Sequence, residues 1–156
     1  NNLKMKFAAR SEFNNFSKEN EFYKKHLNEY EYKFLKKNIF YRSKNYKTYK
    51  IMQRSKVVIG TMSTMLRENL SLNGKTFACN FTKTNIFDFP IKGICFTKKS
   101  NYQDFQKKLK KILSLSMKEY CNKMNRTRDY VCNNKINSFE TINLVNKKLK
   151  LILNTK

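Results

Sequence analysis

The sequence is poor in the residues that usually divide a chain into parts. One proline and three glycines occur in 156 residues, and no internal repeat or low-complexity block is present. A chain of this length without a linker is expected to form one domain. No apolar run approaches the roughly 20 residues that a membrane-spanning helix needs, and no signal peptide is recognisable.

Metal-ligating residues are scarce as well. His26 is the only histidine, and the four cysteines, at positions 79, 95, 121 and 132, form no CxxC pair. Zinc sites need closely spaced thiolate and imidazole ligands, so we expect no metal centre. Scattered thiols indicate reduced cysteines and hence a cytoplasmic protein. His26 lies in a charged stretch, which favours a surface residue over a catalyst.

Acidic residues are few compared with basic ones. The chain has 34 Lys and Arg against 11 Asp and Glu, which gives a net charge of +23. Such an excess is typical of proteins that bind nucleic acid, an anionic membrane or a nucleotide. Lysine is abundant together with Asn, Ile, Tyr and Phe, as in AT-rich coding sequences, so a coat of solvated lysines accounts for the charge equally well.

The chain does contain enough apolar residues to form a hydrophobic core. Hydrophobic residues make up 40% and aromatic residues 14% of the sequence, which excludes a disordered polycation. Alternation or short apolar runs predict strands over residues 3–9, 39–41, 56–59, 75–80 and 94–96. Helical spacing predicts helices over residues 17–37, 45–54, 64–73, 101–113, 116–132 and 139–152.

Strands that alternate with helices predict βαβ units and therefore a mostly parallel sheet. Ser17 and the Ser116-x-x-Glu119 capping box mark two of the helix starts, and Gly74 suits the end of a third. We predict an α/β fold: a Rossmann-like half domain with a short, mostly parallel sheet and a helical C-terminal tail.

The turn after Ile59 is the strongest candidate for a binding site. Gly60 ends a strand, and Thr61, Ser63 and Thr64 lead directly into a helix. Ligands of open parallel sheets bind at the carboxyl ends of the strands, and free N–H groups at a helix start favour phosphate. One turn later, the carboxylate of Glu68 is placed to meet ribose or substrate hydroxyls. The alternative is an ordinary helix cap, with Glu68 as a surface charge.

A second polar group follows the next predicted strand. Asn80 and Thr82 lie where that strand ends, at the start of a long aromatic loop that reaches Pro90 and contains Asp88. Long loops in compact domains are often functional, although Phe87 and Phe89 favour a loop tethered to the core. Gly74-Lys75-Thr76 resembles the end of a phosphate-binding P-loop, but the required earlier glycine is absent and the helix precedes the strand, so we reject that interpretation.

Residues 57–68 (VVIGTMSTMLRE), followed by Gly74-Lys75, residues 79–82 (CNFT) and residues 88–94 (DFPIKGI), resemble bacterial surface-polysaccharide glycosyltransferases. The resemblance is to the carboxyl-terminal half of the two-Rossmann-domain (GT-B) class and extends over about residues 45–132. A related pattern appears in sialyltransferases, Kdo-transferases and CDP-glycerol glycerophosphotransferases. In these enzymes a Ser/Thr pair that follows a strand binds the donor phosphate.

The resemblance implies that residues 1–156 are a single nucleotide-sugar-binding domain of a longer, cytoplasmic, two-domain enzyme. The donor would be the nucleotide-activated sugar, used without a metal or other cofactor. The acceptor would be a glycan or a lipid-linked molecule of capsule, O-antigen or lipopolysaccharide synthesis. The catalytic base would lie on the missing N-terminal domain, and the chain, which begins at Asn1 rather than Met, would be a piece of the whole enzyme.

The resemblance also assigns roles to individual residues. Those expected to bind the donor phosphate are Gly60, Thr61, Ser63, Thr64, Arg10 and Arg67. Those expected to meet the donor's ribose or sugar are Glu68, Asn80 and Thr82. The basic run at 107, 108, 110 and 111 lies on a predicted amphipathic helix, and a peripheral contact with the inner face of the membrane is set against the alternative of an ordinary solvated helix face. Two alternatives are a basic nucleic-acid-binding α/β domain, which lacks any recognisable motif, and a degenerate domain that serves in assembly.

Overall fold

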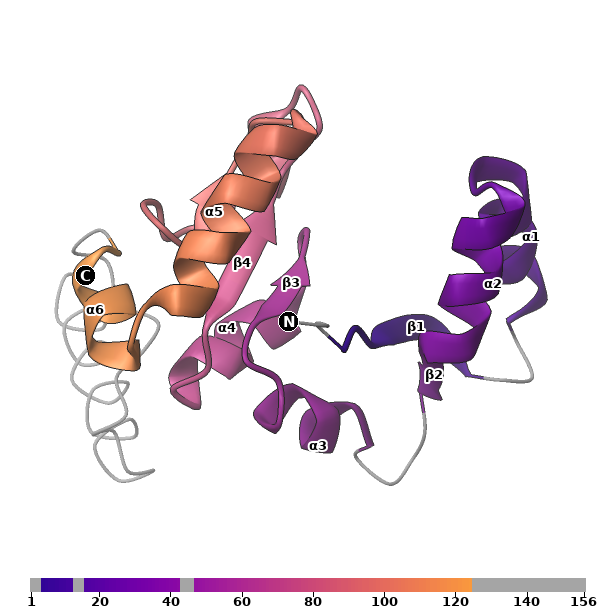
Figure 1. Ribbon diagram of the computed structural model, residues 1–156, viewed down its shortest axis with the longest axis horizontal. Coiled ribbons are helices and arrows are strands. Elements are labelled where there is room, and N and C mark those ends of the chain that lie inside the picture. Colours follow the sequence, from indigo (N-terminus) through magenta and orange to yellow (C-terminus); the bar gives the residue numbers. More distant parts are fainter. Residues whose placement is uncertain (1–3, 13–15, 43–46, 125–156) are drawn as a thin grey trace, which may run out of the picture. The chain divides into compact units, whose positions relative to one another are not determined.

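The computed structural model describes residues 4–12, 16–42 and 47–124, and side chains within this part except at positions 10–12, 42 and 47. The chain forms two compact units, Asn1–Met52 and Gln53–Lys156. Figure 1 shows the elements of each unit, which are described separately below. Whether the two units act as one functional domain stays a prediction.

Unit 1 is built on two parallel strands. Strand β1 (Phe7–Glu12) pairs with β2 (Ile39–Arg42), with Phe7 opposite Ile39 and Ala8 opposite Phe40. Between them the chain forms helices α1 (Ser17–His26) and α2 (Glu29–Asn38). Helix α3 (Lys47–Gln53) follows β2 and ends at the boundary between the units.

The prediction of a single helix over residues 17–37 is wrong, because the helix is interrupted near Asn28 and a second helix begins there. The Asn28 side chain accepts a hydrogen bond from the Glu31 amide at 2.9 Å, and the Glu31 carboxylate accepts one from the Asn28 amide at 3.0 Å. This reciprocal cap starts a new helix. The cap predicted at Ser17 is also absent, since Phe16 occupies the N-cap position of α1 without a side-chain bond.

Unit 2 contains a three-stranded parallel sheet in the order β3–β4–β5. Strand β3 (Val58–Gly60) leads through helix α4 (Thr64–Ser71) into β4 (Thr76–Cys79). A loop with a 3₁₀ turn, η2 (Asn85–Phe87), leads to β5 (Phe96–Thr97). Helices α5 (Tyr102–Ser114) and α6 (Met117–Asn122) complete the described part of the unit.

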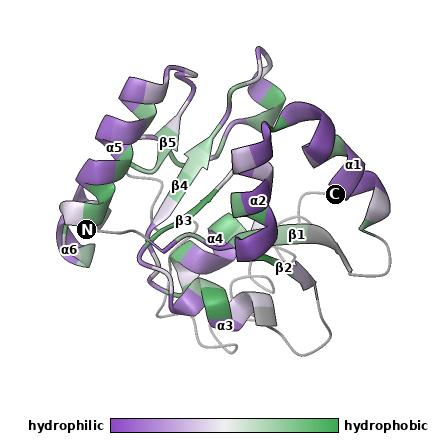
Figure 2. Cartoon of the chain, turned by 45° about the vertical axis from the view of Figure 1, so that its right-hand side comes forward, coloured by the Kyte–Doolittle hydropathy of each residue, from purple (hydrophilic) through white to green (hydrophobic). Residues whose placement is uncertain are grey.

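Helices cover both faces of β4. The Thr76 hydroxyl donates to the carbonyl of Leu66 in α4 at 3.1 Å, whereas the Phe77 ring stacks on Phe105 of α5 with centroids 5.3 Å apart. Because side chains alternate along a strand, α4 and α5 lie on opposite sides. Figure 1 shows α5 in front of β4. In Figure 2 β3 is green and the outer surface of α5 mostly purple, as expected when apolar residues pack inward.

The end of α4 uses a different residue from the predicted glycine. Asn73 takes the left-handed conformation with φ 61°, which asparagine tolerates better than most residues. Gly74 serves another purpose, because a Cβ atom there would collide with the side chain of Asn69. Asn69 is 3% exposed and donates to the Lys75 carbonyl and the Thr76 hydroxyl, both at 2.9 Å.

The predicted fold class is confirmed: the chain is α/β, with short parallel strands and helices toward the C-terminus, and unit 2 has the βαβ order of a Rossmann-like half domain. The capping box at Ser116 is confirmed as well. The helix predicted over 116–132 is wrong in its length, because α6 ends at Asn122 and Met124 instead pairs with Gly93 in an isolated bridge. The helix predicted over 139–152 lies outside the described residues. No helix in the described part of the chain has the length and apolar character needed to cross a bilayer.

Candidate functional site

The predicted turn lies at the carboxyl edge of unit 2, which we define as the ends of β3, β4 and β5 and the residues that directly follow them. Ser63 is the N-cap of α4, and its hydroxyl accepts a hydrogen bond from the Met65 amide at 3.3 Å. Thr61, Ser63 and Thr64 are exposed and Gly60 is half-buried. The turn therefore presents small polar residues and the start of a helix to solvent.

The first turn of α4 differs in charge from the first turns of most of the other described helices. Helices α1, α2, α5 and α6 each have an acidic residue in the first turn, such as Asp104 in α5. Helices α3 and α4 have none. The positive dipole end of α4 is thus not neutralised by a carboxylate of its own first turn, and an anion at the turn would be stabilised by about 0.3–1 kcal/mol in an exposed position.

Asn80 lies beside this turn, but its side-chain amide is already fully hydrogen-bonded within the loop. Gly60 pairs with Ala78, so Asn80 follows β4 at the same edge of the sheet. It is 1% exposed. Its Nδ2 donates to the Thr84 carbonyl at 2.9 Å and to Asp88 Oδ1 at 2.6 Å, and its Oδ1 accepts from the amide and the hydroxyl of Thr82 at 3.0 and 2.6 Å.

These bonds use all four hydrogen-bonding positions of the Asn80 amide group. Asn80 and Thr82 therefore hold the base of the loop, and a direct bond from Asn80 to a donor sugar would require one of these contacts to open. Thr82 itself is exposed. The contact of both residues with the donor stays a prediction.

Asp88 forms the ion pairs of this loop, a role that its sequence context indicates only in part. Its carboxylate lies 2.8 Å from Lys92 Nζ and 3.1 Å from Lys98 Nζ. The hydrogen bond from Lys92, together with those from Asn80 and Lys98, lowers the pKa of Asp88 to about 2, against the opposing effect of desolvation. The Asp88–Lys92 spacing of four is visible in the sequence, whereas Lys98 comes close only through the fold.

The remaining candidates lie further from the turn or outside what the structure describes. Arg67 is exposed and Glu68 half-buried, both in α4 one turn beyond its start. Leu66, Asn69 and Leu70 form the buried side of α4. Arg10 lies in β1, in unit 1, and its side chain is not described. The structure thus brings Gly60, Thr61, Ser63 and Thr64 together, and places Arg67 and Glu68 along the same helix.

Two of the lysines that sequence patterns singled out, Lys75 and Lys108, form hydrogen bonds within the fold. Lys75 Nζ donates to the carbonyl of Ile112 at 3.0 Å and to that of Leu115, at the C-terminal end of α5. It lies at the amino end of β4, opposite to the candidate turn, which agrees with the rejection of a P-loop. Lys108 Nζ points inward and donates to the carbonyls of Gly93 (2.9 Å) and Phe96, and burial lowers its pKa.

Neither the histidine nor the described thiols form a reactive pair. His26 is exposed, stacks on Phe22 with centroids 4.2 Å apart, and its Nδ1 lies 2.8 Å from the Phe22 carbonyl. This agrees with a surface residue. Burial raises the pKa of the Cys79 thiol to about 11, which the charge of Lys108 only partly opposes. Thiolate chemistry at Cys79 is therefore disfavoured.

Residues 1–90 match the model of a protein family described as putative O-antigen biosynthesis protein. The match spans unit 1 and the β3–α4–β4 segment with its following loop, and includes every candidate residue from Arg10 to Thr82. It ends before β5. No curated protein and no solved structure matches the chain.

Proposed function

Since this chain belongs to a family of putative O-antigen biosynthesis proteins, we propose that it is the donor-binding part of a glycosyltransferase. The enzyme would transfer a sugar from an activated nucleotide to the growing polysaccharide or its lipid-linked precursor. The catalytic base and much of the acceptor site would be supplied by a second domain, and the reaction would use no metal or other cofactor.

One observation carries the proposal: the turn from Gly60 to Ser63 joins the carboxyl end of a parallel strand to a helix whose first turn contains no acidic residue. A nucleotide sugar carries a diphosphate or phosphate, and such a turn offers N–H groups, hydroxyls and a positive dipole end to that group. Stabilising the leaving phosphate in this way lowers the barrier to sugar transfer. Thr64 and Glu68, on one side of α4, would meet the phosphate and the sugar hydroxyls respectively.

Calorimetric titration of the chain with CMP, CDP, UDP and GDP tests the proposal. We expect saturable binding of one nucleotide, and the preferred base would identify the donor class. A short DNA duplex serves as the polyanion comparison. Binding of DNA alone, with steep weakening as salt rises, would contradict the proposal and favour the nucleic-acid alternative.

The variants must separate phosphate binding from helix capping, because Ser63 does both in the proposal. Ser63→Asp retains a capping oxygen for the Met65 amide but places a negative charge at the turn, so it should abolish nucleotide binding without loss of stability. Ser116→Ala is the matched control, because it removes the cap of α6 at a cost of about 1 kcal/mol and should leave the affinity unchanged. Equal nucleotide affinity of Ser63→Asp and the unmodified chain would contradict the site.

A further inference from the structure

The exposed apolar side chains of unit 2 are not spread evenly over its surface. Among the described residues of this unit, seven large hydrophobic side chains are exposed, and six of them lie at the carboxyl edge or in the segments that follow it. These six are Ile59, Met62, Phe81, Ile86, Phe87 and Tyr102. The seventh, Leu72, lies at the opposite end of α4. Exposed apolar side chains that gather in one part of a surface are typical of interaction sites.

Four of these side chains form a group that we call the apolar edge: Phe81, Ile86, Phe87 and Tyr102. Phe81 packs edge-on against Phe105, with centroids 6.4 Å apart, and Tyr102 lies one turn before Phe105 on α5. Lys98 bonds to Asn85 and pairs with Asp88, and thereby fixes the segment that carries Ile86 and Phe87 beside the start of α5.

The loop is held firmly while these side chains point outward. Phe89 is 5% and Ile91 0% exposed, so both anchor the loop in the core. Asn80 and Asp88 fix its base through the hydrogen bonds described above. Yet Ile86 is 80% exposed and Phe87, expected to be a tether, is 36% exposed. The anchored loop therefore presents Ile86 and Phe87 to solvent from a well-defined backbone.

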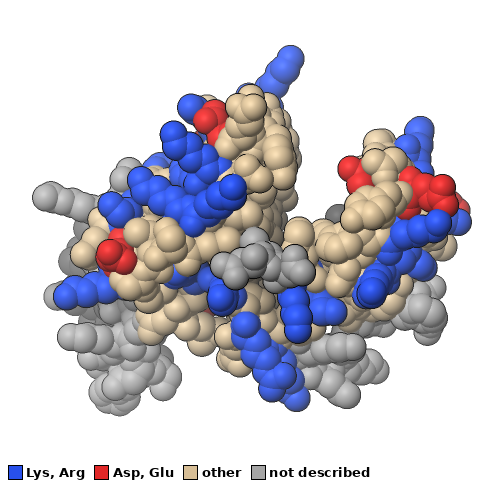
Figure 3. Space-filling model, in the orientation of Figure 1, with Lys and Arg blue, Asp and Glu red and all other residues tan. Residues whose placement is uncertain are grey.

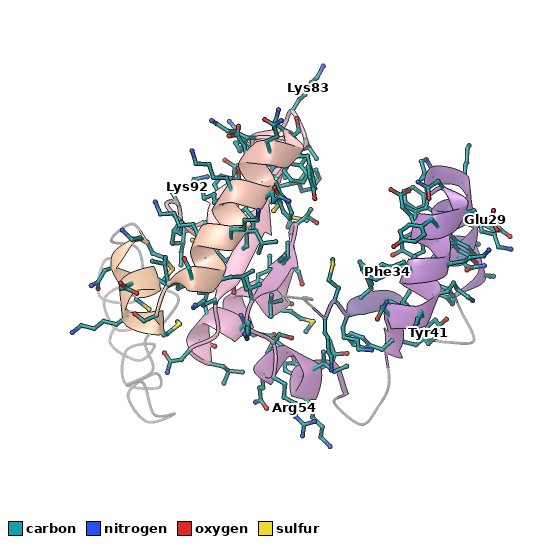
Figure 4. All side chains as sticks on the ribbon, viewed as in Figure 1. Glu29, Phe34, Tyr41, Arg54, Lys83 and Lys92 are labelled. Atoms are coloured by element: carbon teal, nitrogen blue, oxygen red, sulfur yellow. The ribbon has the colours of Figure 1, made fainter. Side chains whose placement is uncertain are left out.

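Exposed lysines lie at the tip of the loop and along α5, the helix that begins at the apolar edge. Lys83 is exposed at the loop tip, where Figure 4 shows it pointing away from the fold, and has no hydrogen-bond or ion-pair partner among the described residues. Lys107, Lys110 and Lys111 are exposed on the outer surface of α5. Figure 3 shows basic residues gathered over that helix. Lys108, in the same run, points inward and does not contribute.

We propose that the apolar edge docks on an anionic lipid bilayer. Phe81, Ile86, Phe87 and Tyr102 would enter the interfacial region, and Lys83 with the outer lysines of α5 would contact the headgroups. Apolar side chains bordered by lysine are the usual composition of interfacial anchors, whose lysine stems lie along the apolar surface while the charge stays at the headgroups. A protein partner is the weaker match, because lysine is depleted in protein–protein interfaces.

The docking proposal stands on the surface alone and does not require the donor site. Its consequence for catalysis does rest on the proposed function. The turn at Ser63 lies at the same edge of the sheet, so docking would bring a lipid-linked acceptor toward the proposed donor site.

Co-sedimentation of the full chain with vesicles tests the docking. Vesicles of phosphatidylcholine with phosphatidylglycerol should bind the chain, and vesicles of phosphatidylcholine alone should bind it far less. Ile86→Ser should lower the partition coefficient about tenfold, because the transfer of a large aliphatic side chain is lost. Replacing Lys107, Lys110 and Lys111 by Gln should lower it about fivefold for each charge.

Leu72→Ser is the matched control, because Leu72 is 53% exposed but lies away from the edge. It should bind vesicles like the unmodified chain. Equal binding by the Ile86→Ser and Leu72→Ser variants would overturn the proposal. So would a concentration-dependent dimer that Ile86→Ser dissociates in the absence of vesicle binding, since a second copy would then cover the edge.

Three further measurements help to interpret these outcomes. Circular dichroism of each variant should match the unmodified chain, as expected for substitutions at exposed positions. Tyr102→Ser, at the other end of the apolar edge, should repeat the loss seen with Ile86→Ser. Nucleotide titration without vesicles reports on the donor site separately, so failure of docking and failure of the proposed function give different results.

Discussion

Gly74 is the residue at which the packing of α4 against β4 leaves no room for a side chain. A Cβ atom there would meet Oδ1, Cγ and Nδ2 of Asn69, a buried residue held by the Lys75 carbonyl and the Thr76 hydroxyl. We predict that Gly74→Ala lowers the free energy of unfolding by about 1–3 kcal/mol. Urea unfolding, followed by circular dichroism, measures the change.

A double-mutant cycle tests the proposed cause. Asn69→Ala removes the obstacle together with its hydrogen bonds, so adding Gly74→Ala in that background should cost at least about 1 kcal/mol less than in the unmodified chain. Additive effects of the two substitutions would show that the collision is not the source of the destabilisation.

Asp88 gives the chain a dependence of stability on acid pH. Its pKa in the folded chain is about 2, below the ordinary value of 3.8, because Lys92, Asn80 and Lys98 hydrogen-bond to the carboxylate. A lowered pKa stabilises the fold above the unfolded-state value, and this contribution disappears as the pH falls from about 4 to about 2. We predict that Asp88→Asn unfolds at a lower urea concentration than the unmodified chain at pH 7.

The difference between Asp88→Asn and the unmodified chain should shrink as the pH falls through this window. Unfolding curves at neutral pH, near pH 4 and near pH 2 measure it. A difference that stays constant over the whole range would show that the ion pairs with Lys92 and Lys98 do not stabilise the fold.

The position of a single residue could be predicted where it depends on the residues next to it in the sequence. Ser63 follows a strand end and precedes a helix, so its place at the carboxyl edge could be deduced from neighbouring sequence. The occupation of the Asn80 amide by Thr82, Thr84 and Asp88 could not, because it depends on how a loop of several residues folds back. The inward direction of Lys108 likewise depends on Gly93 and Phe96, far away in the sequence.

At the scale of elements, α6 is fixed to the start of β4 by one side chain. The hydroxyl of Tyr120, which is fully buried, accepts from the Thr76 amide at 3.0 Å and donates to the Thr76 carbonyl. We predict that Tyr120→Phe lowers the free energy of unfolding by about 1–3 kcal/mol, because a buried amide is left without a partner. Denaturant unfolding measures the change.

Tyr102→Phe provides the comparison, since Tyr102 is 71% exposed and the loss of its hydroxyl should change the stability by less than about 0.5 kcal/mol. If the two variants were equally stable, the hydrogen bonds between Tyr120 and Thr76 would contribute nothing measurable to the attachment of α6.

The existence and order of the elements were more predictable than their limits. The βαβ order of unit 2 followed from a short apolar run, a capped helix and a second apolar run, and it is confirmed. The division of the first predicted helix into α1 and α2 was missed, because apolar spacing continues across Asn28 while its side-chain cap interrupts the backbone. The strand predicted over residues 3–9 begins later, at Phe7, where pairing with β2 starts.

At the scale of the whole molecule, positive charge dominates. The chain carries 34 basic and 11 acidic residues, and among its described residues four ion pairs involve only three acidic side chains, those of Glu29, Asp88 and Asp104. The exposed pairs at Glu29 and Asp104 contribute at most about 1 kcal/mol each, and most of the lysines are left without an acidic partner to offset their repulsion. A net charge of this size is expected to destabilise the compact state through repulsion between like charges.

We predict that added sodium chloride raises the melting temperature, because salt screens this repulsion. A gain of about 1 kcal/mol would correspond to a rise of about 2–4 °C for a chain of this size. Differential scanning calorimetry in low and moderate salt measures the rise. Replacing Lys107, Lys110 and Lys111 by Gln removes three exposed positive charges and should make the rise smaller. A melting temperature that falls with salt in both proteins would mean that attractive ion pairs outweigh the repulsion, and that the excess of lysine does not strain the fold.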